Sequence, residues 1–395
     1  MVEDATAVNN IERPTRVRTG PAGSVRAMTL LALRKEIPAL NTGGYLNYGA
    51  HGPSPRRVVA AVTETLEQHE YAAAEADPYE AAFASYDRSR EQIAALLNVD
   101  SDCIALTEST TDGIARVATA LGLEAGDTVV RTDLEHPAGM LPWRRLERDG
   151  ITVRVVETER GRIDRDAFAD AVADATVVCF SAITWTHGTR LPVADLVGIA
   201  RDAGTFTLVD AVQVPGQTAC DMSEWEADVI AGAGHKWLLG PWGAGFLYVN
   251  PASAHKLAPT MIGYRGATAT DEGVAYDPGA RRLELGSMSP GPHAGLAAAI
   301  DAIRTVGLST IEGRIEMLTN RLKAGIDEDR LLSPRAYHSG LVTIDAQDPA
   351  ATVDRLAEAG LVVRSVPTPD AVRVSVHAVT TEDTIDRVIE AFATS

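Results

Sequence analysis

The chain has 395 residues, of which 45% are hydrophobic, so it is long enough for a large α/β domain and a smaller second one. A formal net charge of −18 argues against a general nucleic-acid or anionic-membrane binder. The acidic surplus and the scarcity of lysine favour a high-salt cytoplasm, although an acidic enzyme from a GC-rich genome would have the same composition.

The cysteines and the N-terminal segment indicate a soluble protein of a reducing cytosol. Cys103 and Cys179 lie in apolar runs and are expected to be buried free thiols, and with Cys220 they match no metal-ligand spacing. Residues 1–24 contain no apolar stretch of the kind found in a secretory leader, and we expect them to be mobile.

The first two thirds of the chain predict alternating strands and helices. A helix is expected over 25–37, a short strand enters the Gly- and Pro-rich turn of 43–55, and helices follow over 56–71 and 79–97. The next predicted strands are 102–106, 128–131, 151–156, 176–181, 205–210 and 245–249, and the helices between them are 114–121, 140–148, 166–172 and 193–203. This alternation predicts an α/β fold with a mostly parallel sheet, whose strand ends collect polar residues along one edge.

The last third of the chain predicts a different organisation. Residues 251–279 are loop-rich, and the predicted helices are 293–306, 309–328, 349–360 and 382–393, with strands at 339–345, 362–366 and 371–376. We therefore predict an N-terminal segment over 1–44, a large domain over 45–285 and a smaller α+β C-terminal domain over 286–395.

The stretch 206–249 holds the residues that predict the chemistry. A strand ends at Asp210, Gln213 follows three positions later, and a second apolar run leads to His235 and Lys236. A lysine can form a Schiff base with a carbonyl cofactor, and a carboxylate can keep a pyridine nitrogen protonated, so that the ring withdraws electrons. Lysine occurs only at positions 35, 236, 256 and 323, and only Lys236 has Gly, Trp and Leu around it. The alternative is a surface lysine whose stem lies along apolar residues.

Two further candidate groups follow strands. Thr110 and Thr111 precede a predicted helix, whose free backbone N–H groups favour a phosphate, although plain N-capping of that helix is the alternative. His136 follows the next strand, where its imidazole could stack on a cofactor ring or cap the turn at Pro137.

These residues resemble a known family. Asp210-Ala-Val-Gln213 and Gly234-His235-Lys236-Trp237, in that order, are similar to motifs of the class V branch of fold type I pyridoxal-phosphate enzymes. Thr110-Thr111, Glu135-His136 and Arg373-Val-Ser375 extend the resemblance, which covers about residues 45–392. This branch includes cysteine desulfurases, selenocysteine lyases, cysteine C–S lyases and isopenicillin N epimerases.

The resemblance implies roles for individual residues. Lys236 would form the internal aldimine and act with His136 in catalysis, and Asp210 would pair with the pyridine nitrogen. Gln213 would bond the phenolic oxygen, and His235 would join Thr110 and Thr111 at the phosphate. Ser287 resembles a residue that reaches the phosphate of the partner chain in a homodimer. Arg373 and His51 are assigned to substrate binding; for Arg373 the alternative is a surface salt bridge.

The chain also departs from the family pattern. Desulfurases carry a nucleophilic cysteine on the loop after an arginine such as Arg364, but residues 364–370 contain none and the loop looks shortened. Trp185 stands where an asparagine is expected, and Ala233 where a serine is usual.

We therefore predict a pyridoxal-phosphate enzyme that acts on a small amino acid, by elimination across a Cβ–S bond. Transamination, epimerisation and desulfuration without the loop cysteine remain alternatives. A non-catalytic relative is disfavoured because Lys236 and Asp210 are both present.

Overall fold

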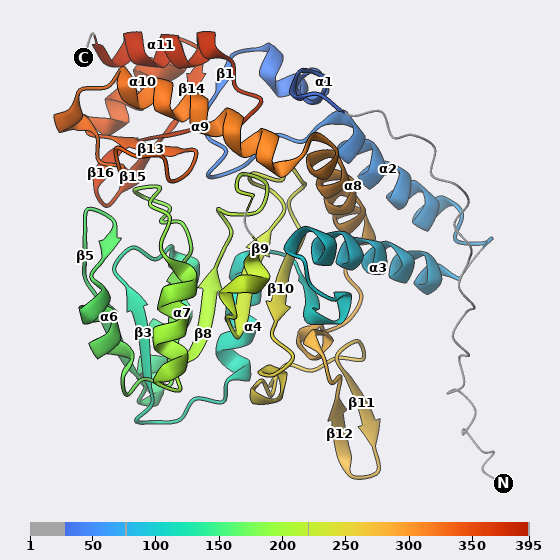
Figure 1. Cartoon of the computed structure of the whole chain (residues 1–395). Helices are drawn as coiled ribbons and strands as arrows, with labels where there is room; N and C mark the ends of the chain where they lie inside the picture. The colour runs from blue at the N-terminus through green and yellow to red at the C-terminus, as the bar shows by residue number, and fades with distance from the viewer. Residues whose placement is uncertain (1–27, 76, 220, 394–395) are drawn as a thin grey trace.

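The computed structural model describes residues 28–75, 77–219 and 221–393 (Figure 1). The expected mobile segment 1–24 and Cys220 lie outside these residues. Cys103 and Cys179 are buried free thiols, as predicted.

A seven-stranded sheet forms the centre of the molecule, with strand order β2-β10-β9-β8-β7-β3-β4 (Figure 1). Its strands are β2 (Ile104–Thr107), β3 (Thr128–Thr132), β4 (Thr152–Val156), β7 (Val177–Ser181), β8 (Phe206–Asp210), β9 (Val229–Ala233) and β10 (Gly245–Val249). The predicted mostly parallel sheet is confirmed, but β10 runs antiparallel to both of its neighbours. The connection between β9 and β10 covers only 234–244, which is too short for the crossover that a parallel pair requires.

Helices cover both faces of this sheet. Neighbouring residues of a strand point to opposite faces, and here the apolar side chains on each face are buried under helices. Val130 and Val209 pack in one cluster with side chains from the first face, whereas Val129 and Leu208 belong to a second cluster on the other. The first face carries α3 (Pro78–Leu97), α6 (Arg165–Val172), α7 (Val193–Asp202) and α8 (Pro290–Val306), and the second carries α4 (Thr110–Ala120) and α5 (Leu141–Leu146).

A smaller sheet and three helices form a second body near the C-terminus, at the top of Figure 1. The antiparallel strands are β13 (Leu341–Ile344), β15 (Arg364–Pro367) and β16 (Asp370–Ser375), in the order β13-β16-β15. The helices α9 (Leu308–Ala324), α10 (Pro349–Glu358) and α11 (Glu382–Ala393) share a third hydrophobic cluster with this sheet. An N-terminal segment joins this body, since β1 (Gly44–Tyr45) pairs in parallel with β14 (Leu361–Val362).

The remaining elements lie at the periphery. They are the helices α1 (Leu30–Lys35) and α2 (Arg56–Tyr71), the hairpin of β5 (Thr158–Glu159) and β6 (Arg162–Ile163), and the hairpin of β11 (Ala267–Thr270) and β12 (Gly273–Tyr276). The β11–β12 hairpin projects from the body of the molecule (Figure 1), within a region that the sequence predicted only as loop.

Several predicted boundaries of helices and strands were wrong. The strand predicted over 102–106 begins only at Ile104, because Ser101–Cys103 forms a 3₁₀ turn. The helix predicted over 140–148 ends at Leu146 and becomes 3₁₀ before Gly150, whose φ is 90°. The strand predicted over 362–366 divides at Val363, because its two halves pair with different strands.

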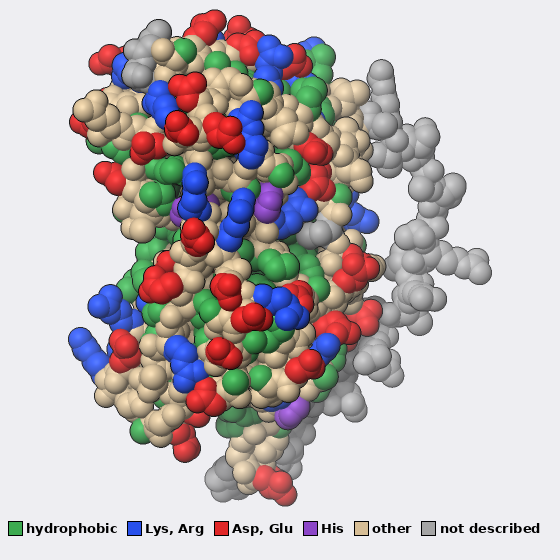
Figure 2. All heavy atoms as spheres, turned by 60° about the vertical axis from the view of Figure 1, so that its left-hand side comes forward, with side chains coloured by type: hydrophobic (Ala, Val, Ile, Leu, Met, Phe, Trp, Pro, Cys, Tyr) green, Lys and Arg blue, Asp and Glu red, His purple; other side chains and the backbone are tan. Residues whose placement is uncertain are grey.

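Acidic side chains are spread over the whole face seen in Figure 2 and are interleaved with Lys and Arg. Among the described residues, no single helix has the length and apolar character to span a bilayer; only α8 and α9 together, bent by 77°, reach that length and composition. The same residues contain no group of three or more His, Cys, Asp or Glu that could hold a metal ion.

Candidate active site

A cavity of about 330 Å³ lies where strand ends of the large sheet meet the β15–β16 hairpin. This is the edge at which open α/β sheets bind ligands. Eight of the ten predicted site residues line it: Thr110, Thr111, His136, Asp210, Gln213, His235, Lys236 and Arg373. Ser287 and His51 do not line it.

Asp210 and Lys236 enter the cavity from two neighbouring strands. Asp210 is the last residue of β8 and is 4% exposed, and its Oδ1 accepts a hydrogen bond from the backbone N–H of Val212 at 2.9 Å. Burial raises the pKa of the Asp210 carboxyl, and the nearby ammonium of Lys236 opposes that shift. Burial lowers the pKa of Lys236 to about 8, while Asp210 acts in the opposite direction. The alternative of a surface lysine is therefore excluded, and the amine can lose its proton near neutral pH.

At the N-terminus of α4, one residue caps the helix and the next two are available to a ligand. Ser109 is the N-cap, and its Oγ accepts from the backbone N–H of Asp112 at 3.1 Å. Thr110 is buried, and its Oγ1 has no hydrogen-bond partner in the described part of the chain. Since Ser109 already provides the cap, the hydroxyls of Thr110 and Thr111 are free to meet an anion at a helix N-terminus.

His136 caps the turn at Pro137, and its ring lies where a cofactor ring could stack on it. Its Nδ1 accepts from the backbone N–H of Ala138 at 3.2 Å, so it caps the turn at Pro137, and its ring also lines the cavity. The ring meets Trp185 edge-on, with centroids 5.3 Å apart and an interplanar angle of 83°. Burial lowers the pKa of His136 to about 4, so a neutral ring faces the cavity.

Gln213 is held by two neighbours. Its Nε2 donates to the carbonyl of Gly49 at 3.0 Å, and its Oε1 accepts from Nε1 of Trp237 at 2.7 Å. One N–H of the amide therefore stays available for the predicted contact with a phenolic oxygen.

His235 and His51 belong to an aromatic stack. The ring of Trp242 lies 4.3 Å from that of His235 and 5.5 Å from that of His51. His51 Nδ1 also contacts the carbonyl of His235 at 3.1 Å. His51, which was predicted to bind substrate, thus lies outside the cavity and packs against a residue of its wall.

Arg373 is fully buried in the cavity wall, with 1% of its surface exposed. Its Nη1 donates to the carbonyl of Trp185 at 2.8 Å, while Nε and Nη2 have no partner within the described residues. It forms no ion pair there, so the alternative of a surface salt bridge is excluded. Two N–H-bearing nitrogens remain for a carboxylate.

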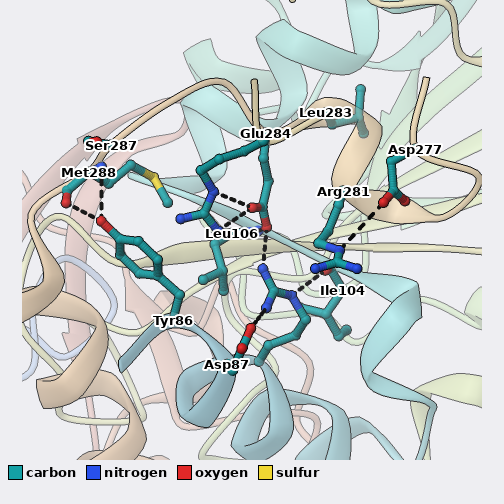
Figure 3. A network of polar contacts seen from close by, with 12 residues as sticks. Tyr86, Asp87, Ile104, Leu106, Asp277, Arg281, Leu283, Glu284, Ser287 and Met288 are labelled. Atoms are coloured by element: carbon teal, nitrogen blue, oxygen red, sulfur yellow. Dashed lines mark hydrogen bonds and ion pairs between the residues drawn. The ribbon is translucent and has the colours of Figure 1, made fainter. Parts of the chain in front are cut away.

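Ser287 lies outside the cavity, beside Met288 and the polar network around Glu284 (Figure 3). Its Oγ is 2.6 Å from the hydroxyl of Tyr264, and both side chains are exposed. Close by, the buried carboxylate of Glu284 is held by Arg90 at 2.8 Å and by Arg265. This ion-pair cluster fixes the segment that presents Ser287 at the surface.

Among the residues not predicted for the site, Arg364 and Trp242 line the cavity, and Glu135 is the neighbour of lining residue His136. Arg364 lines the cavity from β15, and Trp242 lines it from the turn before β10. Glu135 lies buried behind His136, and its carboxylate accepts from Thr132 Oγ1 and Ser181 Oγ, each at 2.6 Å. The Gly- and Pro-rich turn around Trp242 was visible in the sequence, but the positions of Arg364 and Glu135 depend on tertiary contacts.

A family model described as Aminotransferase class-V matches residues 44–388. The chain belongs to the class V aminotransferase family. It is 33% identical over 306 residues to a probable cysteine desulfurase of Methanothermobacter thermautotrophicus, covering 74% of this chain and 75% of that protein. It is 30% identical to isopenicillin N epimerase of Streptomyces clavuligerus, covering 88% of this chain and 93% of the relative. The solved cystine C–S lyase C-DES, in complex with cysteine persulfide, superposes with a TM-score of 0.82 at 26% identity, covering 90% and 99% of the two chains.

This family member is a pyridoxal-phosphate-dependent enzyme with the fold type I architecture, and another structure of C-DES has glycine covalently linked to that cofactor. The side chains of the cavity fit the cofactor. The unpartnered hydroxyl of Thr110 suits the phosphate, the buried carboxylate of Asp210 suits the ring nitrogen, and the amine of Lys236 suits the aldehyde. These three groups meet in one cavity although they come from the start of α4, the end of β8 and the connection after β9.

Proposed function

We propose that this enzyme cleaves the Cβ–S bond of a small sulfur-containing amino acid by elimination. The observation that supports this most is that three groups meet in one cavity: Lys236, which can lose its proton, the buried carboxylate of Asp210, and the buried, unpaired guanidinium of Arg373. No described cysteine lines this cavity. The relatives named as desulfurase and cystine C–S lyase favour chemistry at a carbon–sulfur bond.

Each side chain has a role in this reaction. Arg373 binds the α-carboxylate of the substrate through Nε and Nη2. Lys236 Nζ, neutral above a pKa of about 8, takes the proton from Cα. Pyridoxal phosphate, when bound, supplies an electron-withdrawing ring next to Cα, and Asp210 holds the ring nitrogen protonated. The electron pair of the Cβ–S bond leaves on sulfur, and with one water the products are a thiol, pyruvate and ammonia.

Elimination is favoured over desulfuration because the hairpin after Arg364 is short. β15 ends at Pro367 and β16 begins at Asp370, with Pro367 and Asp370 paired across the turn. A loop long enough to carry a nucleophilic cysteine into the cavity is missing from this described segment. Among the cysteines elsewhere in the chain, Cys179 is buried, and burial raises the pKa of its thiol well above the usual range.

A panel of amino acids that includes cysteine and cystine tests the reaction. We expect pyruvate together with sulfide or persulfide, and loss of turnover in Lys236→Ala while the fold is retained. Alanine with sulfide would identify a desulfurase, a keto acid with neither sulfide nor persulfide an aminotransferase, and the opposite enantiomer an epimerase, as the relative from Streptomyces clavuligerus is named. Any of these three product patterns would contradict elimination.

We also propose that the enzyme is a cytoplasmic homodimer that acts on small molecules rather than on nucleic acids or membranes. The net charge of −18 and the buried free thiols of Cys103 and Cys179 support this assignment. In the dimer, Ser287 of each chain reaches the cofactor phosphate of its partner. Its position outside the cavity of its own chain, next to exposed Tyr264, supports a role across the interface.

A further inference from the structure

A second cavity, of about 460 Å³, lies between the β5–β6 hairpin and the segment that joins α9 to β13. Figure 1 shows this hairpin beneath the small body. The cavity shares no lining residue with the active-site cavity. Its charged lining residues are Arg160, Arg162, Arg335, Glu328 and Asp329. None of these side chains has a role in the proposed reaction.

The three arginines of this cavity are not neutralised by the chain itself. Arg160 Nη2 donates to the carbonyl of Leu331 at 3.2 Å, and Arg335 Nη1 donates to the carbonyl of Lys323 at 2.7 Å. No ion pair within the described residues includes any of the three arginines, or either of the two acids that line the same cavity. Their charges therefore remain available to a ligand.

The β5–β6 turn holds Arg160 in a backbone conformation that suits other residues better. Its φ is 49° and that of Gly161 is 78°, and a hairpin turn with two positive φ values favours Asn-Gly. An arginine is strained there because its Cβ lies close to the following carbonyl oxygen. The turn cannot easily shift, since a Cβ at Gly161 would lie 2.7 Å from the Cβ of His187. Backbone strain of this kind is typical of functional sites.

The opposite wall of the cavity is fixed by buried side chains. Lys323 is 2% exposed, and its Nζ donates to the carbonyls of both neighbours of Arg335, at 2.7 and 2.9 Å. The buried hydroxyl of Ser333, which also lines the cavity, donates to the carbonyl of His187 at 2.6 Å. Because these bonds hold the wall in place before a ligand arrives, binding would cost little ordering of the backbone.

The mixture of charges in the lining selects the kind of ligand. Guanidinium groups bind carboxylates through paired hydrogen bonds, whereas Glu328 and Asp329 would repel a ligand that carries negative charge alone. An ammonium group on the same ligand would attract these two acids. Three arginines against two acids leave one positive charge in excess, and a second carboxylate on the ligand would balance it. The lining therefore suits an amino acid with an acidic side chain.

We propose that this cavity binds a free acidic amino acid, with its carboxylates on the three arginines and its ammonium group on the two acids. Lys236 and the cofactor-binding residues line the other cavity, so a ligand here is bound rather than converted. The site is separate from the proposed elimination and does not depend on it.

Thermal unfolding of the holoenzyme tests the site with L-glutamate as the probe. At equal ionic strength, L-glutamate should raise the thermal midpoint more than glutarate, which lacks the ammonium group, and more than inorganic phosphate. Any contribution from binding at Arg373 is the same in a variant that alters only the β5–β6 turn, so such a variant isolates the second cavity.

Arg160→Asn is the decisive variant, because it removes the guanidinium and suits the turn. Its midpoint without ligand should rise, whereas L-glutamate should lose most of its added stabilisation. In calorimetric titration the dissociation constant of L-glutamate at this site should weaken by roughly tenfold to a hundredfold, the usual worth of a hydrogen bond to a charged group. Arg148→Gln, at an exposed position of a 3₁₀ turn, is the matched control and should keep both wild-type values.

Glu328→Gln tests the contact with the ammonium group. It should reduce the response to L-glutamate to that of glutarate, while the response to glutarate is kept. Equal responses of the wild type and Arg160→Asn to L-glutamate overturn the proposal. Equal stabilisation of the wild type by glutarate and L-glutamate also overturns it, since negative charge alone would then be recognised.

Discussion

Glu135 is a buried carboxyl that has hydroxyl partners but no ion pair within the described residues. Burial raises its pKa to about 7, against the effect of the bonds from Ser181 and Thr132, and the charge of Asp210 adds to the rise. The native protein therefore holds a proton on Glu135 that the unfolded chain gives up at a lower pH. The stability that this proton confers is complete below the ordinary pKa of 4.5 and is lost as the pH rises through about 7.

Glu135→Gln should therefore stabilise the protein at pH 8 and leave its stability nearly unchanged at pH 5. An amide stays neutral at both values and can keep the contacts to Ser181 and Thr132, so the gain at pH 8 should be about 1–3 kcal/mol. Urea unfolding of the apoprotein at the two pH values measures it. Glu272→Gln, at an exposed position of the β11–β12 turn, is the control and should show no such pH dependence. A gain of equal size at both pH values would show that Glu135 is ionised throughout.

At the scale of elements, α4 connects helix capping with cofactor binding. Ser109 closes the N-terminus of α4, which directs the backbone N–H groups and the hydroxyl of Thr110 at the cavity. Ser109→Ala should cost about 1 kcal/mol of stability, the usual value for a lost N-cap. It should also weaken cofactor binding severalfold, because the first turn of the helix frays.

The control for this variant is a cap of the same type far from the cavity. Asp164 caps α6 through a bond from the backbone N–H of Ala167 at 2.8 Å. Asp164→Ala should lower the urea midpoint by a similar amount without changing the cofactor dissociation constant, measured by quenching of tryptophan fluorescence. If both variants lose the same affinity, α4 has no special role in holding the phosphate.

At the scale of the whole molecule, the network around Glu284 carries Ser287 on an exposed surface (Figure 3). If Ser287 acts across a homodimer, Lys236→Ala and Ser287→Ala disable different halves of each site. Mixed dimers of the two variants would then contain one site with both residues intact. Co-expression should restore activity that neither variant shows alone, and sedimentation should give the mass of two chains. If verified mixed dimers regain no activity, Ser287 does not act at the active site of the partner chain.

The predicted domain division at residue 286 stays a prediction, as do the roles assigned to single site residues. β1 of the N-terminal part pairs with β14 near the C-terminus, so sequence order alone does not separate the two bodies. Pairing of distant segments cannot be inferred from local patterns, because it depends on which strand edges are left free after the rest has folded.

The sequence by itself determined the mostly parallel α/β fold, the family and the pair of Asp210 and Lys236. These follow from local facts: alternating apolar runs predict strands and helices, and among basic side chains only lysine can form the required bond. Only the tertiary structure decided that the hydroxyl of Thr110 is buried in the cavity without a partner, that Gln213 bonds to Gly49 and Trp237, and that Arg373 is buried and bonds to the carbonyl of Trp185. Register, burial and counter-charges arise from contacts between residues far apart in the chain, and no local pattern encodes them.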